Sequence, residues 1–181
     1  MKKILALALC LCMVICAVAC TTKEPEAKEA EYKLGLGVVV STASSKENNA
    51  QVDATIAAVV TDAEGKIVAC RIDVAQNKMD ITNGAVDTAK TFETKMELGD
   101  RYGMAGKVDN NGDGVMKEWF EQSKAFSEYA VGKTAADIKG MQTTEANGHQ
   151  ITVDQALLDA GCSIQITGIC AVVAQAAENA R

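Results

Sequence analysis

The sequence holds few of the residues that enzymes most often use for chemistry. It has one histidine, one proline and few aromatic residues: one Trp, three Tyr and three Phe. The single histidine, His149, follows an Asn-Gly turn, which disfavours a His-based triad and excludes a His-rich metal site. The sequence also lacks a Gly-x-Ser-x-Gly elbow, a Cys-x-x-Cys pair and a phosphate-binding loop of Gly and Lys. A hydrolase is not expected.

The charge balance argues against nucleic acid as a partner. The chain has 18 Lys and Arg against 24 Asp and Glu, a net charge of −6. Removing Lys2 and Lys3 with a leader segment would leave 16 basic residues against 24 acidic ones, a net charge of −8. Such a surface argues against nucleic acid and against electrostatic adhesion to anionic lipid.

The first twenty residues have the pattern of an export signal. Lys2 and Lys3 precede an uncharged apolar run over 4–19, and the small residues Ala17-Val18-Ala19 stand directly before Cys20. The pattern resembles a bacterial lipoprotein signal, which implies that residues 1–19 are removed and that Cys20 is acylated, for example with palmitate. An ordinary cleaved secretory signal is the alternative. The lipoprotein resemblance implies a chain held by lipid on the extracytoplasmic face of the cell membrane.

A charged segment separates this signal from the rest of the chain. Residues 20–31 hold the only proline, Pro25, and no large apolar residue. This composition predicts a disordered tether. Residues 32–181 are long enough for one domain with a hydrophobic core.

Three cysteines remain outside the leader, Cys70, Cys162 and Cys170. An odd number in an exported chain leaves two readings open, one disulfide with a free thiol or three small buried apolar groups. Their spacing does not form a metal site.

A β-hairpin over residues 51–74 is the strongest structural signal. Both arms alternate apolar and polar residues, and the linker Asp62-Ala-Glu-Gly65 predicts a type I turn with Gly65 left-handed. The expected register pairs four sets of residues on one buried face: Val60 with Val68, Ala58 with Cys70, Ile56 with Ile72, and Ala54 with Val74. A preceding strand over 32–42 contains Gly35 and Gly37, which would permit a close backbone approach.

Helical signals dominate the second half of the chain. A stripe of Trp119, Ser123, Phe126 and Ala130 predicts a helix over 115–131 that ends at Gly132. Further helices are expected after Thr134, after Thr152 and over 169–180, and an alternating strand over 162–167. The predicted class is α+β, an antiparallel sheet built on a central β-hairpin with helices packed on one face.

One local motif indicates a metal. Asp109-Asn-Asn-Gly-Asp-Gly114 matches positions 1, 3, 5 and 6 of a calcium loop, but position 12 is Phe120 instead of Glu. A structural calcium site would use oxygen atoms of Asp109, Asn111, Asp113, Val115 and a displaced Glu118. The alternative is a solvated turn whose Asp113 caps the following helix.

The order of elements resembles the FMN-binding-domain family. The residues that support the resemblance are Asp62-Ala-Glu-Gly-Lys-Ile67, Glu118-Trp-Phe-Glu-Gln122 and Val131-Gly-Lys-Thr134. The last two stretches are similar to flavin-domain-like lipoproteins of anaerobic Gram-positive bacteria. In the family, a flavin transferase can esterify FMN phosphate to a Ser or Thr outside the cell.

The resemblance implies a set of cofactor residues. Asp154 would stand for the family's Asp, and Ala160-Gly161-Cys162-Ser163 for its Ser/Thr-Gly-Ala-Thr/Ser motif, with Ser163 as acceptor. Ala160 and Cys162 depart from that motif, and the other reading of Ser163 is a solvent-facing strand residue. The flavin ring would need an apolar slot, which the hairpin, Tyr102, Met104 and the Trp119 helix could line.

Two functions follow from these observations. The first is a membrane-anchored extracellular flavoprotein-like domain that carries electrons through covalent FMN. The second is a cofactor-free surface-binding lipoprotein that keeps the fold but not the flavin.

Overall fold

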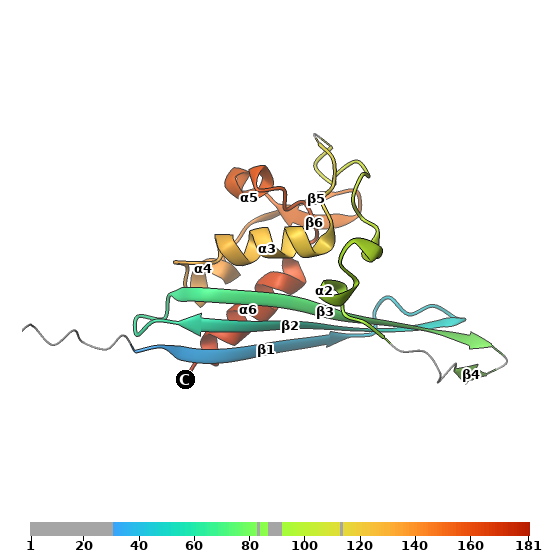
Figure 1. Ribbon diagram of the computed structural model, residues 1–181, viewed down its shortest axis with the longest axis horizontal. Coiled ribbons are helices and arrows are strands. Elements are labelled where there is room, and N and C mark those ends of the chain that lie inside the picture. Colours follow the sequence, from blue (N-terminus) through green and yellow to red (C-terminus); the bar gives the residue numbers. More distant parts are fainter. Residues whose placement is uncertain (1–30, 83, 87–91, 113) are drawn as a thin grey trace, which may run out of the picture. The chain divides into compact units, whose positions relative to one another are not determined.

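An antiparallel sheet in the strand order β1-β2-β3-β4 forms the base of the domain (Figure 1). The computed structural model describes residues 31–82, 84–86, 92–112 and 114–181. The strands are β1 (Lys33–Ser41), β2 (Asn49–Thr61), β3 (Ile67–Thr82) and β4 (Ala85–Val86). The predicted signal peptide 1–19, with Cys20 and nearly all of the 20–31 tether, lies outside the described residues.

In the described residues, six helical segments accompany the sheet, and the predicted α+β class is confirmed. They are α2 (Lys95–Leu98), the 3-10 helix η1 (Gly99–Tyr102), α3 (Trp119–Tyr129), α4 (Ala135–Lys139), α5 (Gln155–Asp159) and α6 (Thr167–Glu178). α6 packs on β1 and β2, and α3 packs on β3. Within the part of the chain that the structure describes, no helix is both long and apolar enough to cross a membrane.

The hairpin turn between β2 and β3 forms as predicted. The Gly65 N–H donates to the Asp62 carbonyl at 3.1 Å, and Gly65 has a φ of +79°. The Asp62 carboxylate also accepts from the Lys66 N–H at 2.8 Å. Glycine adopts this left-handed conformation without a steric cost, because it has no β-carbon.

The predicted hairpin register is wrong beyond the turn. Thr61 pairs with Ile67 as the prediction requires, but the register then shifts, so that Val60 pairs with Ala69. β3 therefore contains one extra residue at Val68, a β-bulge. Because of this shift, Ile72 lies opposite Ala57 and not opposite Ile56.

The shift changes which face of β2 is buried. Ala57 and Val59 are fully buried. On β3, Ile72 and Val74 are buried as predicted, whereas Val68 is 38% exposed and Cys70 is half-buried. The residues of β2 that the sequence assigned to the core instead point to the opposite face and are half-buried or exposed: Ala54, Ile56, Ala58 and Val60. One extra residue in β3 is enough to change which β2 residues share a face with Ile72 and Val74, because successive side chains of a strand point to opposite faces.

Glycines in β1 determine the side on which α6 packs. Gly35 pairs with Val59 and Gly37 with Ala57, so both glycines lie on the same face as that buried pair. The backbone of α6 lies directly against them, which confirms the predicted close approach. The other face of β1 carries leucine and valine side chains, which would keep a helix backbone at a greater distance.

α3 buries the predicted stripe but is shorter than expected. Trp119, Ser123, Phe126 and Ala130 are all buried. The helix starts at Trp119 because residue 118 forms a capping box with Glu121.

The final third contains one hairpin that the sequence analysis missed and lacks one strand that it predicted. β5 (Thr143–Ala146) pairs with β6 (His149–Thr152) across an Asn147-Gly148 turn with φ values of 51° and 78°. Residues 162–167 form no strand. The N–H groups of Ser163 and Ile164 donate to the side chain of Gln122 instead of to a neighbouring strand.

Candidate functional site

Ser163, the residue that the family resemblance implies as flavin acceptor, is enclosed in the protein. Its exposed fraction is 4%, and its Oγ is buried without a hydrogen-bond partner. Its backbone is held on both sides: the N–H donates to Gln122 Oε1 at 2.9 Å, and the carbonyl accepts from Asn110 at 2.8 Å. Both sequence-based readings of Ser163 assume an accessible hydroxyl, and the structure contradicts that assumption.

Asp154 and Gly161 have structural roles at the two ends of α5. The Asp154 carboxylate accepts from the Ala156 and Leu157 N–H groups and from the Tyr129 hydroxyl. Hydrogen bonding by Tyr129 is the main cause that lowers the pKa of Asp154, while burial and this bond raise the pKa of Tyr129 to about 12. Gly161 has a φ of +87° and ends the helix.

A narrow recess, here called the slot, lies at the N-terminal end of α6. Its volume is about 170 Å³, and its lining includes Asp53, Gln76, Lys95, Trp119, Gln165 and Gly168. These residues come from β2, β3, α2, α3 and the start of α6, so the fold alone brings them together. Tyr102, the fourth cofactor residue expected from the sequence, lies beside it, with its hydroxyl 3.5 Å from Gln76.

Lys95 is the cation of the slot and lies against two aromatic rings. Its Nζ is 4.8 Å from the ring centroid of Tyr102 and 5.3 Å from that of Trp119. A cation at this distance interacts favourably with the ring face. The lysine is therefore directed into the slot and not into open solvent.

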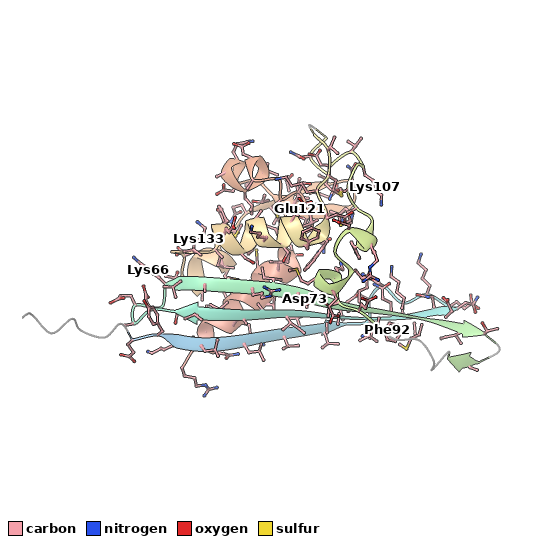
Figure 2. The ribbon with its side chains drawn as sticks, viewed as in Figure 1. Lys66, Asp73, Phe92, Lys107, Glu121 and Lys133 are labelled. Carbon is pink, nitrogen blue, oxygen red and sulfur yellow. The ribbon has the colours of Figure 1, made fainter. Side chains whose placement is uncertain are left out.

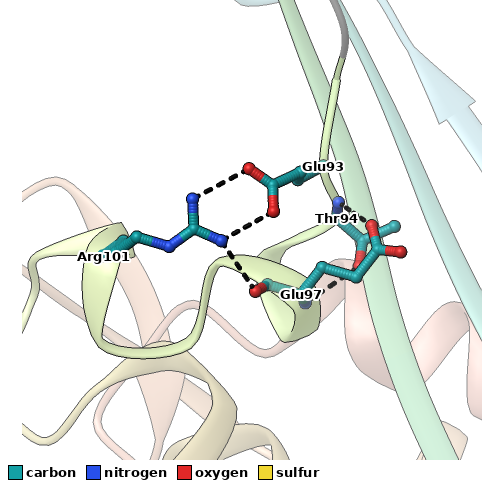
Figure 3. A network of polar contacts seen from close by, with 4 residues as sticks. All are labelled: Glu93, Thr94, Glu97 and Arg101. Carbon is teal, nitrogen blue, oxygen red and sulfur yellow. Dashed lines mark hydrogen bonds and ion pairs between the residues drawn. The ribbon is translucent and has the colours of Figure 1, made fainter.

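A polar network holds the short helix that positions Lys95. Thr94 and Glu97 form a reciprocal capping box, and Arg101 binds the Glu93 carboxylate through two nitrogens at 2.9 and 2.6 Å (Figure 3). Asp73 of β3, labelled in Figure 2, accepts from the Met96 N–H at 3.2 Å and so attaches α2 to the sheet. A four-residue helix would not be stable without such contacts.

The slot favours an anion despite one carboxylate in its wall. The first turn of α6 has no side-chain cap, so its N–H groups and the positive end of the helix dipole are available. Lys95 adds a full positive charge. Asp53 opposes an anion, but its carboxylate already accepts from the Gln51 amide at 3.0 and 2.8 Å.

A larger recess near Asp154 has the wrong charge for a phosphate. It has a volume of about 700 Å³ and is lined by Tyr129, Lys133, Asp137 and Asp154 among others. Its one lysine stacks on Tyr129, with 4.0 Å between the ammonium and the ring centroid. Figure 2 shows Lys133 at the same end of the sheet as Lys66, where the Ile67 N–H donates to the Lys133 carbonyl at 2.8 Å. Two carboxylates against one lysine make this recess a poor phosphate site.

The described residues of the predicted calcium loop make other contacts. Asp109 uses its carboxylate to accept from the Gly112 and Gly114 N–H groups at 3.0 and 3.1 Å. Val115 forms a bridge with Val108, Asn111 lies in the same turn, and Asp113 lies outside the described residues. Among the residues that the structure describes, no three His, Cys, Asp or Glu side chains form a metal-binding group. The calcium site stays a prediction.

Glu118, the proposed twelfth-position substitute, binds a different loop. It is 4% exposed, and its two oxygens accept from the Met104 and Ala105 N–H groups at 3.1 and 3.0 Å. Burial alone would raise the pKa of this carboxyl, but the backbone hydrogen bonds outweigh burial and lower it. Glu118 thus joins the loop that contains Met104 and Ala105 to the start of α3.

The three described cysteines are free thiols. Burial raises the pKa of Cys70 to about 11, of Cys162 to about 12 and of Cys170 to about 11. Each remains protonated near neutral pH. Cys162 fits the reading as a small buried apolar group, whereas Cys70 and Cys170 are only half-buried.

Sequence reasoning missed the residues that define the slot. No functional pattern marks the segments that contain Lys95, Gln76 and Gln165. Gln122 belongs to Glu118-Trp-Phe-Glu-Gln122, a stretch that supports the family resemblance but predicts no contact with Ser163. The one available signal was Thr94-Lys-Met-Glu97, a capping-box spacing that predicts a helix start beside a lysine.

Comparison with known proteins links this chain to part of a larger one. It is 31% identical over 156 residues to the chlorophenol reductase of Desulfitobacterium hafniense, covering 75% of this chain and 46% of the reductase. The chain therefore spans about half the length of this relative. No protein-family profile and no solved structure matches the chain.

Proposed function

We propose that this chain is a lipid-anchored, extracytoplasmic redox domain that binds FMN without a covalent bond, with the FMN phosphate in the slot. The observation that carries the proposal is the uncapped start of α6 facing Lys95, which itself lies against Tyr102 and Trp119. Similarity to a reductase supports a redox role, and the leader pattern ending at Cys20 supports the lipid anchor.

The donors of the slot fit a phosphate group. Backbone N–H groups at the start of a helix bind phosphate oxygens, and a lysine beside them supplies the countercharge. The side-chain amides of Gln76 and Gln165 can each donate a further hydrogen bond. When bound, FMN would supply the electron transfer, while these residues bind and orient its phosphate end.

The size of the slot limits what it can enclose. Pockets that enclose a drug-sized ligand usually measure about 300–1,000 Å³. At about 170 Å³, the slot accommodates the phosphate end of FMN and not the whole cofactor. Binding is therefore expected to be modest and dependent on salt, because a charged group provides most of it.

A covalent bond to Ser163 does not fit the structure. Esterification requires the hydroxyl to reach both FMN and a flavin transferase, yet this hydroxyl is enclosed and its backbone is fixed by Gln122 and Asn110. We therefore expect the protein, co-produced with a flavin transferase, to keep an unmodified polypeptide mass. A mass increase of one FMN that disappears in Ser163→Ala would contradict this.

FMN fluorescence tests the slot directly. Titrating the purified full chain into FMN should quench flavin emission, and Lys95→Ala should weaken binding by about tenfold, as the loss of a charge-assisted contact does. Lys124→Ala is the matched control, since Lys124 lies exposed on α3 and pairs only with Glu128 at 3.7 Å. Equal binding by both variants, or no binding by the parent, would reject the site.

The second candidate is the cofactor-free surface-binding lipoprotein. The enclosed Ser163, the small slot and the uncovered aliphatic face of the main sheet favour it. It predicts no quenching of FMN at any protein concentration. Both candidates share the anchor, which mass spectrometry of Cys20 in the parent and in Cys20→Ala would test.

A further inference from the structure

The face of the main sheet opposite α6 is aliphatic and uncovered. Leu34, Leu36, Val38 and Val40 of β1 have exposed fractions of 64%, 57%, 43% and 61%. Their partners on β2 continue the same face: Val60, Ala58, Ile56 and Ala54. These eight residues are here called the open face. Contiguous apolar patches of a few hundred Å² on a monomer are often functional.

The open face is also free of carboxylates in an acidic protein. None of its eight residues is charged, whereas the chain as a whole has a net charge of −6. On β3, Arg71 lies opposite Ala58 and Asp73 lies opposite Ile56. The Asp73 carboxylate accepts from the Met96 and Val74 N–H groups, so it is turned toward α2. An anionic surface would be repelled least from this side of the domain.

The edge of β1 beside the open face is partly closed by the C-terminus. Leu34 and Arg181 exchange two backbone hydrogen bonds of 3.3 Å. The Val38 N–H donates to Gln175 at 2.9 Å, and the Leu36 carbonyl accepts from Asn179 at 3.1 Å. Strand addition at this edge is therefore blocked at three positions. Because these backbone groups already have hydrogen-bond partners, removing water from them costs little free energy.

The size of the open face argues against a stable dimer. At about 3.4 Å per residue and 4.8 Å per strand, its two strands of seven residues cover on the order of 230 Å². A stable complex buries about 800 Å² on each partner. A second copy packed on this face would thus be held weakly, whereas a surface to which the chain is already attached needs no such area.

The length of chain between Cys20 and β1 indicates the occupant. Tyr32, 61% exposed, and Leu34 are among the first residues of the described domain, and only residues 21–31 separate them from Cys20. At no more than about 3.6 Å per residue, that segment reaches roughly 40 Å. An acylated Cys20 would therefore keep the start of β1, where the open face begins, within roughly 40 Å of the bilayer.

We propose that the open face rests on the lipid bilayer, with the aliphatic side chains of β1 in the headgroup region. The inference depends on the proposed acylation of Cys20. Side chains of this kind enter about 5–10 Å into the headgroup and acyl boundary. The slot lies on the opposite face of the sheet, because Asp53 and Gln76 point to the α6 side, so docking leaves the slot in water.

Tryptophan quenching by brominated lipid tests this orientation. The full chain, purified with its anchor, is reconstituted into vesicles of phosphatidylcholine and phosphatidylglycerol with or without brominated acyl chains. Leu36→Trp should lose at least about half of its added emission in brominated vesicles, since bromine quenches indoles at that depth. Val108→Trp is the control, because Val108 is 71% exposed in a loop far along the chain. The native Trp119, 4% exposed, contributes the same background to both.

Each outcome decides the proposal. Selective quenching of the L36W variant supports it. If L36W shows no thermal unfolding transition and is therefore not folded, L34W takes its place. Vesicle flotation with equal quenching of L36W and V108W rejects the docking face but keeps the anchor. Failure to float, with an unmodified Cys20 by mass spectrometry, rejects both. A dimer in detergent that Leu36→Lys converts to a monomer assigns the face to a second copy and overturns the lipid proposal.

Discussion

Gly35 of β1 lies so close to Ala176 of α6 that a β-carbon on the glycine would be 1.8 Å from the Ala176 carbonyl oxygen. The same construction at Gly37 places a β-carbon 2.1 Å from the Val172 carbonyl oxygen. Both neighbours are helix backbone, which cannot rotate away as a side chain can. The contact therefore fixes the distance between the sheet and its main helix.

Gly35→Ala is expected to lower the free energy of unfolding by about 3 kcal/mol or more, because overpacking against backbone forces helix and strand apart. Gly168→Ala is the matched control, since no atom lies within 4 Å of the added carbon. It should be neutral or stabilising by up to about 1 kcal/mol. Urea denaturation measures both variants. Similar stability in the two would show that α6 does not rest on Gly35.

Gln122→Leu should destabilise the protein by about 2–4 kcal/mol. The buried Gln122 amide accepts from the Ser163 and Ile164 N–H groups and donates to the Lys117 carbonyl at 2.8 Å. Leucine fills a similar volume but leaves three polar groups without a partner. Gln155→Leu, an exposed change on α5, should alter the midpoint of urea denaturation very little. Equal effects would contradict the role given to Gln122.

Glu118 should make stability depend on pH below the ordinary carboxyl range. Its pKa is lowered in the folded protein from 4.5, so the unfolded chain binds a proton first as pH falls. The stabilisation that Glu118 gives to the folded protein is fully present above its pKa in the unfolded chain. It is lost as pH falls through the lower pKa of the folded protein. Glu118→Gln should flatten the decline in unfolding free energy between neutral pH and about pH 3, whereas the exposed Glu128→Gln should not. Parallel curves for the parent and E118Q would reject this.

Asp154→Ala should lower stability without affecting flavin binding. The substitution removes the N-cap of α5 and the partner of the Tyr129 hydroxyl, which together should cost about 1–3 kcal/mol. Asp159→Ala, whose carboxylate accepts only from the Gln155 amide among the bonds described, should cost less than about 0.5 kcal/mol. Calorimetry and FMN titration separate the two effects. A weaker flavin affinity in D154A with normal stability would restore the cofactor role that the family resemblance implies.

Local patterns in the sequence were sufficient for several parts of the fold. Gly65 and the residues around it predict the hairpin turn, because only glycine takes that conformation without a steric cost. Thr134 and Asp137 predict the start of α4 by their capping spacing, and both side chains form the expected bonds. Gly35 and Gly37 predict a close backbone contact, which α6 makes.

The site depended on contacts that no local pattern contains. Lys95 and Trp119 meet at the slot only after β3, α2 and α3 have packed together. Ser163 is enclosed because Gln122, 41 residues earlier in the chain, binds the backbone beside it. A motif comparison treats such a residue as accessible, since side-chain burial is a property of the packed chain.

The sequence by itself determined the two arms of the main hairpin, its turn, the capped start of α4 and the two glycines that admit a helix, because each depends on neighbouring residues alone. Only the tertiary structure decided which face of the hairpin that helix covers. Strand alternation defines two faces but does not rank them, and the extra residue at Val68 changes the pairing between them. The glycines of β1 then place α6 on the less aliphatic side of β2, and the more aliphatic side stays open.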